Sequence, residues 1–121
     1  LYDLSFVMLA MAWRYRLTRD SQPLSRLHET FDFITRRMRL DEGFVSIIPD
    51  DGERRQNPHM HFLEACLAAF AATEDQRFLD QARAVVDLFE RRFFDGRTLG
   101  ERFAPDWARR QEQTLEPGHH F

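Results

Sequence analysis

The stretch Arg55-Gln56-Asn57-Pro58-His59-Met60-His61-Phe62-Leu63-Glu64 decides how the rest of the chain is organised. Proline fits the first turn of a helix, because the N–H that it lacks would have no partner there. An asparagine directly before the proline can cap the helix with its side chain. The stretch therefore predicts a helix that begins at Pro58, with Asn57, Met60 and His61 around its N-terminus. An imidazole there feels the positive end of the helix dipole, which favours its neutral, proton-accepting form.

Two kinds of helical pattern alternate along the chain. Residues 2–17 and 58–72 are apolar around nearly the whole helix circumference, which predicts helices that are buried on all sides. Residues 23–39 and 75–93 carry one apolar stripe with charges on the other face, as outer helices do. The last of these should begin at a cap on Asp75. Its charged face should expose Arg83, Asp87, Glu90 and Arg91.

Two long loops separate these helices and point to a repeat. Residues 40–57 contain a short extended piece at 43–48 and a turn at 49–52, and a strand is expected at 98–103 in the second loop. Asn57-Pro58 and Glu116-Pro117 open equivalent units whose starts are 59 residues apart (116 minus 57). A repeat of two helices per unit is typical of a stacked or toroidal array. The expected fold is all-α. The chain would form part of an (α/α) barrel, which consists of an inner and an outer ring of helices.

The amino-acid composition indicates which binding partners and which cellular compartment to expect. A net charge of -3 with 43% hydrophobic residues describes a globular domain and favours neither nucleic acid nor an anionic membrane surface. The longest apolar run is too short to cross a bilayer. Cys66 stands alone in an apolar run, so we expect a core residue in a reduced, cytoplasmic compartment.

These motifs resemble the N-acylglucosamine 2-epimerase family, which includes mannose isomerases and cellobiose 2-epimerases. The resemblance is carried by residues 55–65, Leu99-Gly100-Glu101 with Asp106-Trp107, Glu116-Pro117-Gly118-His119, and Tyr2-Asp3 with Phe6. It implies an (α/α)6 barrel of about six helical hairpins. Residues 1–121 would then be a middle fragment covering about a third of the barrel and inactive alone. A second acid/base histidine of the family would lie outside it.

The resemblance also implies a reaction. The family moves a proton at C2 of an unphosphorylated aldose through a cis-enediolate, and mannose–fructose isomerisation is the first choice here. The alternative is 2-epimerisation of N-acylglucosamine or of cellobiose-type sugars. His119 matches an acid/base histidine, and His61 matches the histidine assigned to ring opening. The matching substrate-binding positions are Tyr2, Arg55, Asn57, Met60 and Arg109.

The same resemblance implies a sugar as the partner, no metal or redox cofactor, and allows a homodimer of the full-length protein. The choice between Arg109 and Arg110 as the sugar-binding arginine stays open. Trp107 fits either the core or a platform for a sugar ring, and His28 should lie at the surface.

A metal pair at His59 and His61 is disfavoured by spacing. Residues two apart on a helix point about 200° away from each other, whereas two zinc ligands on one helix need a spacing of four. His59 is therefore expected to face elsewhere and to bond a loop carbonyl.

Two other classes of protein are alternatives to the sugar isomerase. A glycoside-processing barrel would need paired carboxylates, for which Glu64 and Glu116 are the candidates near the motifs. A non-catalytic helical scaffold would leave the histidines at the helix starts unexplained.

Overall fold

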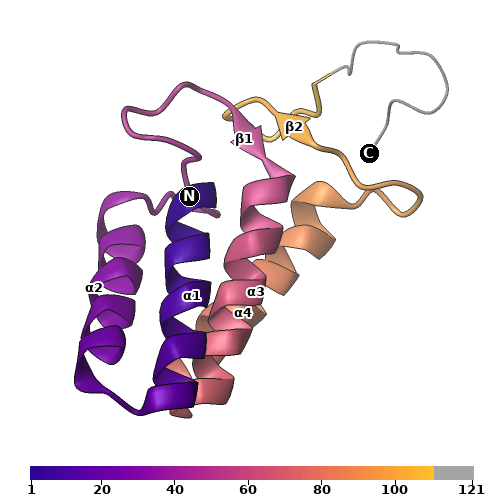
Figure 1. Ribbon diagram of the computed structural model, residues 1–121. Coiled ribbons are helices and arrows are strands. Elements are labelled where there is room, and N and C mark those ends of the chain that lie inside the picture. Colours follow the sequence, from indigo (N-terminus) through magenta and orange to yellow (C-terminus); the bar gives the residue numbers. More distant parts are fainter. Residues whose placement is uncertain (111–121) are drawn as a thin grey trace, which may run out of the picture.

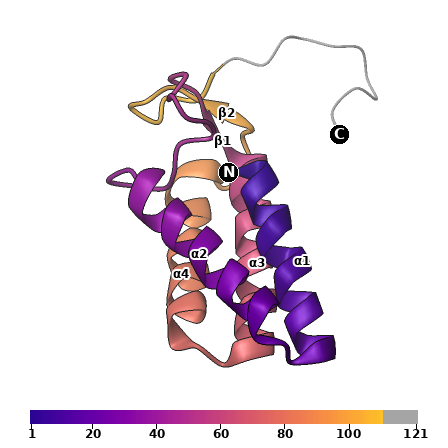
Figure 2. The ribbon, with the colours of Figure 1, turned by 60° about the vertical axis from the view of Figure 1, so that its left-hand side comes forward.

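Two helical hairpins lie side by side in residues 1–110, the part of the chain that this computed structural model describes (Figure 1). The first joins α1 (Tyr2–Thr18) to α2 (Ser21–Arg37), and the second joins α3 (Gln56–Thr73) to α4 (Gln76–Leu88). The helices α1 and α3, here called the inner helices, pack against each other. Each is covered on its other side by its own hairpin partner, as the rotated view shows (Figure 2).

The two hairpins close with the same local chemistry. In the first turn Thr18 Oγ1 accepts a hydrogen bond from the Asp20 N–H at 3.1 Å, and in the second Thr73 Oγ1 accepts from the Asp75 N–H at 3.1 Å. In each turn the residue between the threonine and the aspartate has a left-handed backbone conformation, with φ of 59° at Arg19 and 60° at Glu74. Asp75 also caps α4, as predicted, by accepting from the Arg77 N–H at 3.0 Å. These matching turns show that the hairpin is a structural repeat.

The core lies between the inner helices and the two outer ones. Phe31 of α2 packs edge-on against Phe78 of α4, with ring centroids 4.7 Å apart, and stacks at 6.4 Å from Phe62 of α3. Each fully buried side chain of this size contributes roughly 1.5–3 kcal/mol. Cys66 is buried in the same core, as predicted, and burial raises the pKa of its thiol. The charged residues expected at the surface of α4 and the turn after it are exposed: Arg83, Asp87, Glu90 and Arg91.

The inner helices are not buried on all sides within residues 1–110, and that prediction was wrong. Each leaves one stripe open at helical spacing. On α1 the open stripe consists of Tyr2, Phe6, Ala10, Trp13 and Leu17, and on α3 it consists of Met60, Glu64, Leu67 and Ala71. The physical reason is that two hairpins supply an inner helix with one inner and one outer neighbour, whereas an all-round apolar helix needs partners on every side.

The start of α3 differs from the prediction in position and in its cap. The helix begins at Gln56 rather than Pro58, which lies within the first turn, and no side chain caps it from Arg55. The backbone of Asn57 instead donates to Glu101 Oε1 at 3.3 Å, and that of Gln56 donates to the Glu101 carbonyl at 2.9 Å. A carboxylate there is favoured by the helix dipole. The cap comes from a residue 44 positions away, so local sequence could not reveal it.

The segments between and after the hairpins are mostly irregular. β1 (Arg54–Arg55) pairs antiparallel with β2 (Arg102–Phe103), which places the second long loop beside the start of α3 (Figure 1). The extended piece expected at 43–48 is reduced to one bridge between Arg39 and Phe44, and of the strand expected at 98–103 only β2 and a bridge at Leu99 form.

The predicted helix over 75–93 ends in a wider turn, η1 (Phe89–Phe93), which is a π-helix. The Phe94 N–H closes it on the Phe89 carbonyl at 2.9 Å. None of the helices within residues 1–110 is long and apolar enough to span a membrane.

We predict that replacing Glu101 weakens the start of α3. Glu101→Ala should lower the free energy of unfolding by about 1 kcal/mol, the usual cost of losing a helix cap. Glu101→Gln should cost less, because the amide oxygen still accepts from the Asn57 N–H. Urea unfolding at neutral pH measures both. Glu29→Ala, at an exposed position of α2, is the control and should unfold like the wild type; equal midpoints for Glu29→Ala and Glu101→Ala would contradict the cap.

Candidate functional site

His61 lies near the start of α3 and packs against two aromatic rings of α1. The Tyr2 ring meets it edge-on at a centroid distance of 5.0 Å, and the Phe6 ring lies tilted, also at 5.0 Å. The two α1 rings contact each other at 4.9 Å. One turn further along α3, Glu64 Oε1 lies 3.7 Å from His61 Nδ1. The imidazole side chain is 22% exposed, so it is oriented by its neighbours and still open to a ligand.

Several predicted site residues share this end of the hairpins. Asn57 and His61 are four residues apart and so lie on one face of α3, with Met60 beside them and 36% exposed. Tyr2 begins the neighbouring helix. The structure therefore brings Tyr2 and His61 into contact and sets Asn57 and Met60 within the same first turns of α3.

The predicted arginines are engaged by their own loops. Arg55 Nη2 lies 2.7 Å from Asp51 Oδ2. Arg109 donates to Thr98 Oγ1 at 2.9 Å and to the Phe93 carbonyl at 3.2 Å. These contacts tie each side chain to a loop, and neither is a contact to His61. The neighbour of Arg109, Arg110, forms an ion pair with Glu53 at 2.9 Å, so loop contacts also hold the alternative arginine.

The remaining predicted positions at the chain end lie outside the described residues. These are His119, the proposed acid/base histidine, with its neighbour His120, and Glu116, the second carboxylate of the glycoside-processing alternative.

His59 faces away from His61 and is fully buried. Its Nδ1–H donates to the Arg55 carbonyl at 2.6 Å, and its Nε2 accepts from the Phe44 N–H at 3.0 Å. The expectation that His59 bonds a loop carbonyl is confirmed. Burial, with no countercharge to offset it, lowers the pKa of His59 from 6.5 to about 4. Both ring nitrogens serve the backbone, so His59 does not pair with His61 as a ligand. Residues 1–110 hold no cluster of three or more candidate metal ligands.

Trp107 belongs to the core rather than to an open platform. Its ring lies edge-on to Phe93 at 5.7 Å and tilted against Phe103 at 6.1 Å. Phe93 and Phe103 form a second core cluster with Leu88, and the partly buried Trp107 packs against it.

His28, expected at the surface, is half-buried instead. Its ring stacks on Phe78 at 5.5 Å, which explains the burial.

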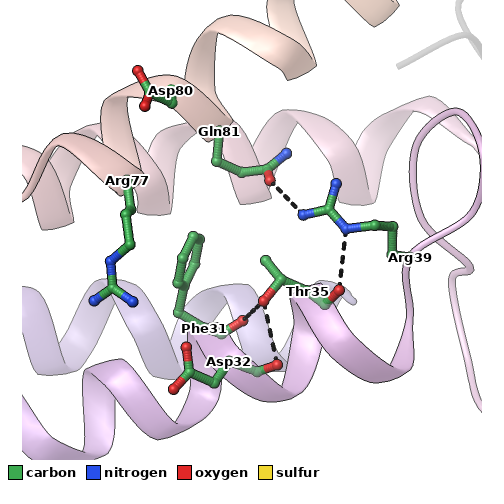
Figure 3. A pocket seen from close by; sticks show the side chains of 7 residues that line it. All are labelled: Phe31, Asp32, Thr35, Arg39, Arg77, Asp80 and Gln81. Atoms are coloured by element: carbon green, nitrogen blue, oxygen red, sulfur yellow. Dashed lines mark hydrogen bonds between the residues drawn. The ribbon is translucent and has the colours of Figure 1, made fainter.

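An open groove between α2 and α4 lies in the outer layer and contains none of the predicted site residues (Figure 3). Arg39 crosses it, donating to Gln81 Oε1 at 3.1 Å and to the Thr35 carbonyl at 3.1 Å. The hydrogen bond from Arg39 to Gln81 therefore bridges the groove between the two hairpins.

Phe6 and Glu64 were not predicted to lie beside His61, although the sequence contains a signal for each. Glu64 was named only as a carboxylate of the glycoside-processing alternative. Phe6 follows Tyr2 by four residues, and Glu64 follows His61 by three, so each shares a helix face with a predicted residue.

Solved structures with the same arrangement of hairpins define the fold. A D-mannose isomerase superposes with a TM-score of 0.78 at 22% identity, covering 88% of this chain and 30% of that chain. Cellobiose 2-epimerase from Spirochaeta thermophila superposes with a TM-score of 0.77 at 25% identity, covering 88% of this chain and 31% of that chain. Cellobiose 2-epimerase from Bacillus thermoamylovorans superposes with a TM-score of 0.79 at 21% identity, covering 90% of this chain and 33% of that chain. The chain spans about a third of the length of these structures.

These superpositions confirm the predicted all-α fold class, since the two helical hairpins match about a third of each solved structure. Among curated proteins no sequence gives a significant match. The family model for N-acylglucosamine 2-epimerase (GlcNAc 2-epimerase) matches residues 1–121, the whole chain. The chain therefore belongs to the N-acylglucosamine 2-epimerase family.

We predict that acid destabilises the protein through His59. Its folded pKa of about 4 lies below the unfolded value of 6.5, so the unfolded chain binds the proton first. The stability contributed by neutral His59 is complete above pH 6.5 and is lost as the pH falls through 4. The loss should approach about 3 kcal/mol, from about 1.4 kcal/mol per unit of pKa.

Urea unfolding between pH 4 and 7 measures this loss. His59→Gln cannot titrate and should give a flatter curve across that range, after the background from carboxylates common to both proteins is subtracted. Equal slopes in the two proteins would contradict the assignment.

Proposed function

We propose that the intact protein is an intramolecular sugar isomerase that moves a proton at C2 of an unphosphorylated aldose through a cis-enediolate. Aldose–ketose isomerisation of the mannose–fructose type is the first choice. The alternative is 2-epimerisation of N-acylglucosamine or of cellobiose-type sugars. The observation that carries the proposal is His61, packed against Tyr2 and Phe6 at the start of α3 in a chain of this family.

The described residues support a role for His61 in ring opening. An imidazole can give or take a proton near neutrality, and ring opening needs a proton moved between the hydroxyl and the ring oxygen. Glu64 Oε1 lies 3.7 Å from Nδ1, so that ring nitrogen is next to a carboxylate. Nε2 is then the nitrogen for the sugar. Tyr2 and Phe6, both more than two-fifths exposed, offer rings to the apolar face of a sugar.

Substrate contacts and the C2 proton complete the proposal. Asn57 and Met60 would line the pocket from α3, and Arg55 and Arg109 would bind the sugar only after leaving their loop contacts. His119 would move the C2 proton as general acid and base. The proton leaves C2 and returns at C1, or at the other face of C2 in the epimerase alternative. The chemistry needs no metal or redox cofactor, because only a proton moves within one molecule.

The proposal concerns the intact protein rather than this chain alone. Residues 1–121 would be part of an (α/α)6-barrel domain, supported by the open stripes of α1 and α3 and by a span of about a third of the matched structures. Further hairpins would cover those stripes and complete the pocket. A cytoplasmic location and a homodimer of the full-length protein are parts of the same proposal.

The two histidines should respond differently to mutation in the intact protein. His119→Ala should abolish isomerisation and stop exchange of the C2 proton with deuterated water, since losing a general acid or base costs about 10²–10⁴ in rate. His61→Ala should recover partly with an analogue that cannot cyclise, because no ring then needs opening. His28→Ala, on α2, is the matched control and should keep near-normal rates. Equal rescue of both active-site variants would overturn the division of roles.

A substrate panel should identify the reaction. We expect mannose to give fructose, with deuterium from the solvent incorporated during conversion. Product analysis on mannose, fructose, N-acetylmannosamine and cellobiose distinguishes the isomerase from either epimerase. Hydrolysis of cellobiose to glucose, or inertness toward all four sugars, would count against the proposed chemistry.

A further inference from the structure

The loop between α2 and β1 connects the starts of the two inner helices. Its Phe44 N–H donates to His59 Nε2 of α3 at 3.0 Å. Two residues later, the Ser46 carbonyl accepts at 2.6 Å from the Leu1 nitrogen, directly before α1. That nitrogen is an ammonium in this chain and would be a peptide N–H in the intact protein of the proposed function. One short backbone segment thus holds both helix starts. Those starts carry Tyr2 and His61, whose rings meet at 5.0 Å.

We propose that His59 is a positioning residue that fixes His61 against Tyr2 by tying the start of α3 to residues 44–46 and so to the start of α1. The link to catalysis rests on the proposed function, whereas the geometric part does not. His59 itself would touch no substrate, because its ring is fully buried and faces away from His61.

The surroundings of His59 make the connection stiff. The imidazole donates to Arg55 one turn earlier and accepts from Phe44, so it bonds its own helix and the loop at once. The buried Phe44 ring packs edge-on against Phe62 of α3 at 5.0 Å, which seats the same loop on the same helix. The Val45 N–H donates to the Met38 carbonyl at 2.8 Å, so the loop cannot move without disturbing the end of α2.

The space beside the ring is equally restricted. Gly43 has φ of +73°, and a Cβ added there would lie 2.9 Å from His59 Nε2 and 2.9 Å from Leu88 Cδ2. A side chain at position 43 would therefore push on the imidazole at the nitrogen that holds the loop. This gives a second way to perturb the connection, with His59 itself unchanged.

Two near-isosteric variants separate the two hydrogen bonds of His59. The side-chain amide of asparagine reaches the position of Nδ1, so His59→Asn keeps the bond to Arg55 and loses the bond from Phe44. Glutamine reaches the position of Nε2, so His59→Gln keeps the bond from Phe44. If the loop connection matters, His59→Gln should behave like the wild type and His59→Asn should not.

The first readout reports geometry and needs no activity. In the intact protein labelled with ¹³C-histidine, the His61 ring resonance is assigned as the one missing from His61→Gln. It should carry a ring-current shift from Tyr2 and Phe6. That shift should move toward the free-histidine value in His59→Asn and in Gly43→Ala, and stay in place in His59→Gln. An unmoved His61 resonance in both perturbing variants would overturn the proposal.

The second readout is steady-state kinetics on the sugar that the wild type turns over. His59→Asn should lower kcat by about 10- to 100-fold with a smaller change in KM, as expected when a catalytic group is misplaced by about 1 Å. His59→Gln should keep most of the wild-type kcat. Ile34→Val, fully buried in α2, is the control for a general loss of stability and should keep kcat.

Each outcome has one meaning. A loss of kcat in Ile34→Val equal to that in His59→Asn, at matched melting temperatures, would make His59 merely structural and overturn the positioning role. A wild type without turnover on any sugar contradicts the proposed function instead, and the His61 resonance then still decides the geometric claim.

Discussion

The hydrogen bonds of one buried imidazole organise the end of the molecule that carries the candidate site. A polar group buried without a partner costs about 1–3 kcal/mol, so the Arg55 carbonyl and the Phe44 N–H each need a partner beneath the loop. Neutral His59 supplies a donor and an acceptor at once, which no carboxylate or ammonium does. Gly43 leaves the room that this arrangement requires. This contact joins the start of α3 to the preceding loop, and the same loop bonds the start of α1 through the Ser46 carbonyl.

The two ends of the hairpins are built by different kinds of interaction. At the closed end, Thr18 and Thr73 bond residues two positions away, and the turn is complete within itself. At the open end, the start of α3 is capped by Glu101 and held by Phe44, which lie far away in sequence. Because this turn is made locally, it has the same form in both described hairpins. An end assembled from loops can differ between hairpins, and differences there leave the packing of the helices unchanged.

This contrast explains what could be predicted from the sequence. The four helices and the Asp75 cap follow from periodicity and from residues one or two positions apart. The cap on α3 could not be predicted, because Glu101 is brought to it by the pairing of β1 with β2. For the site, Tyr2 and His61 were predicted and the structure brings them together, whereas the loop contacts of Arg109 depend on packing that no local pattern encodes.

The wrong prediction about burial and the location of the candidate site have the same cause. Tyr2 and Phe6 lie on the open stripe of α1, and Met60 and Glu64 lie on the open stripe of α3. The same helical spacing describes apolar side chains that would face a ligand and apolar side chains that would face another hairpin. Periodicity therefore counts both as core. What separates them is the position along the helix. Near the start of α3 the loops contribute Phe44 and Glu101 as supports. Further along, at Leu67 or Trp13, packing against another helix would cover the open stripe.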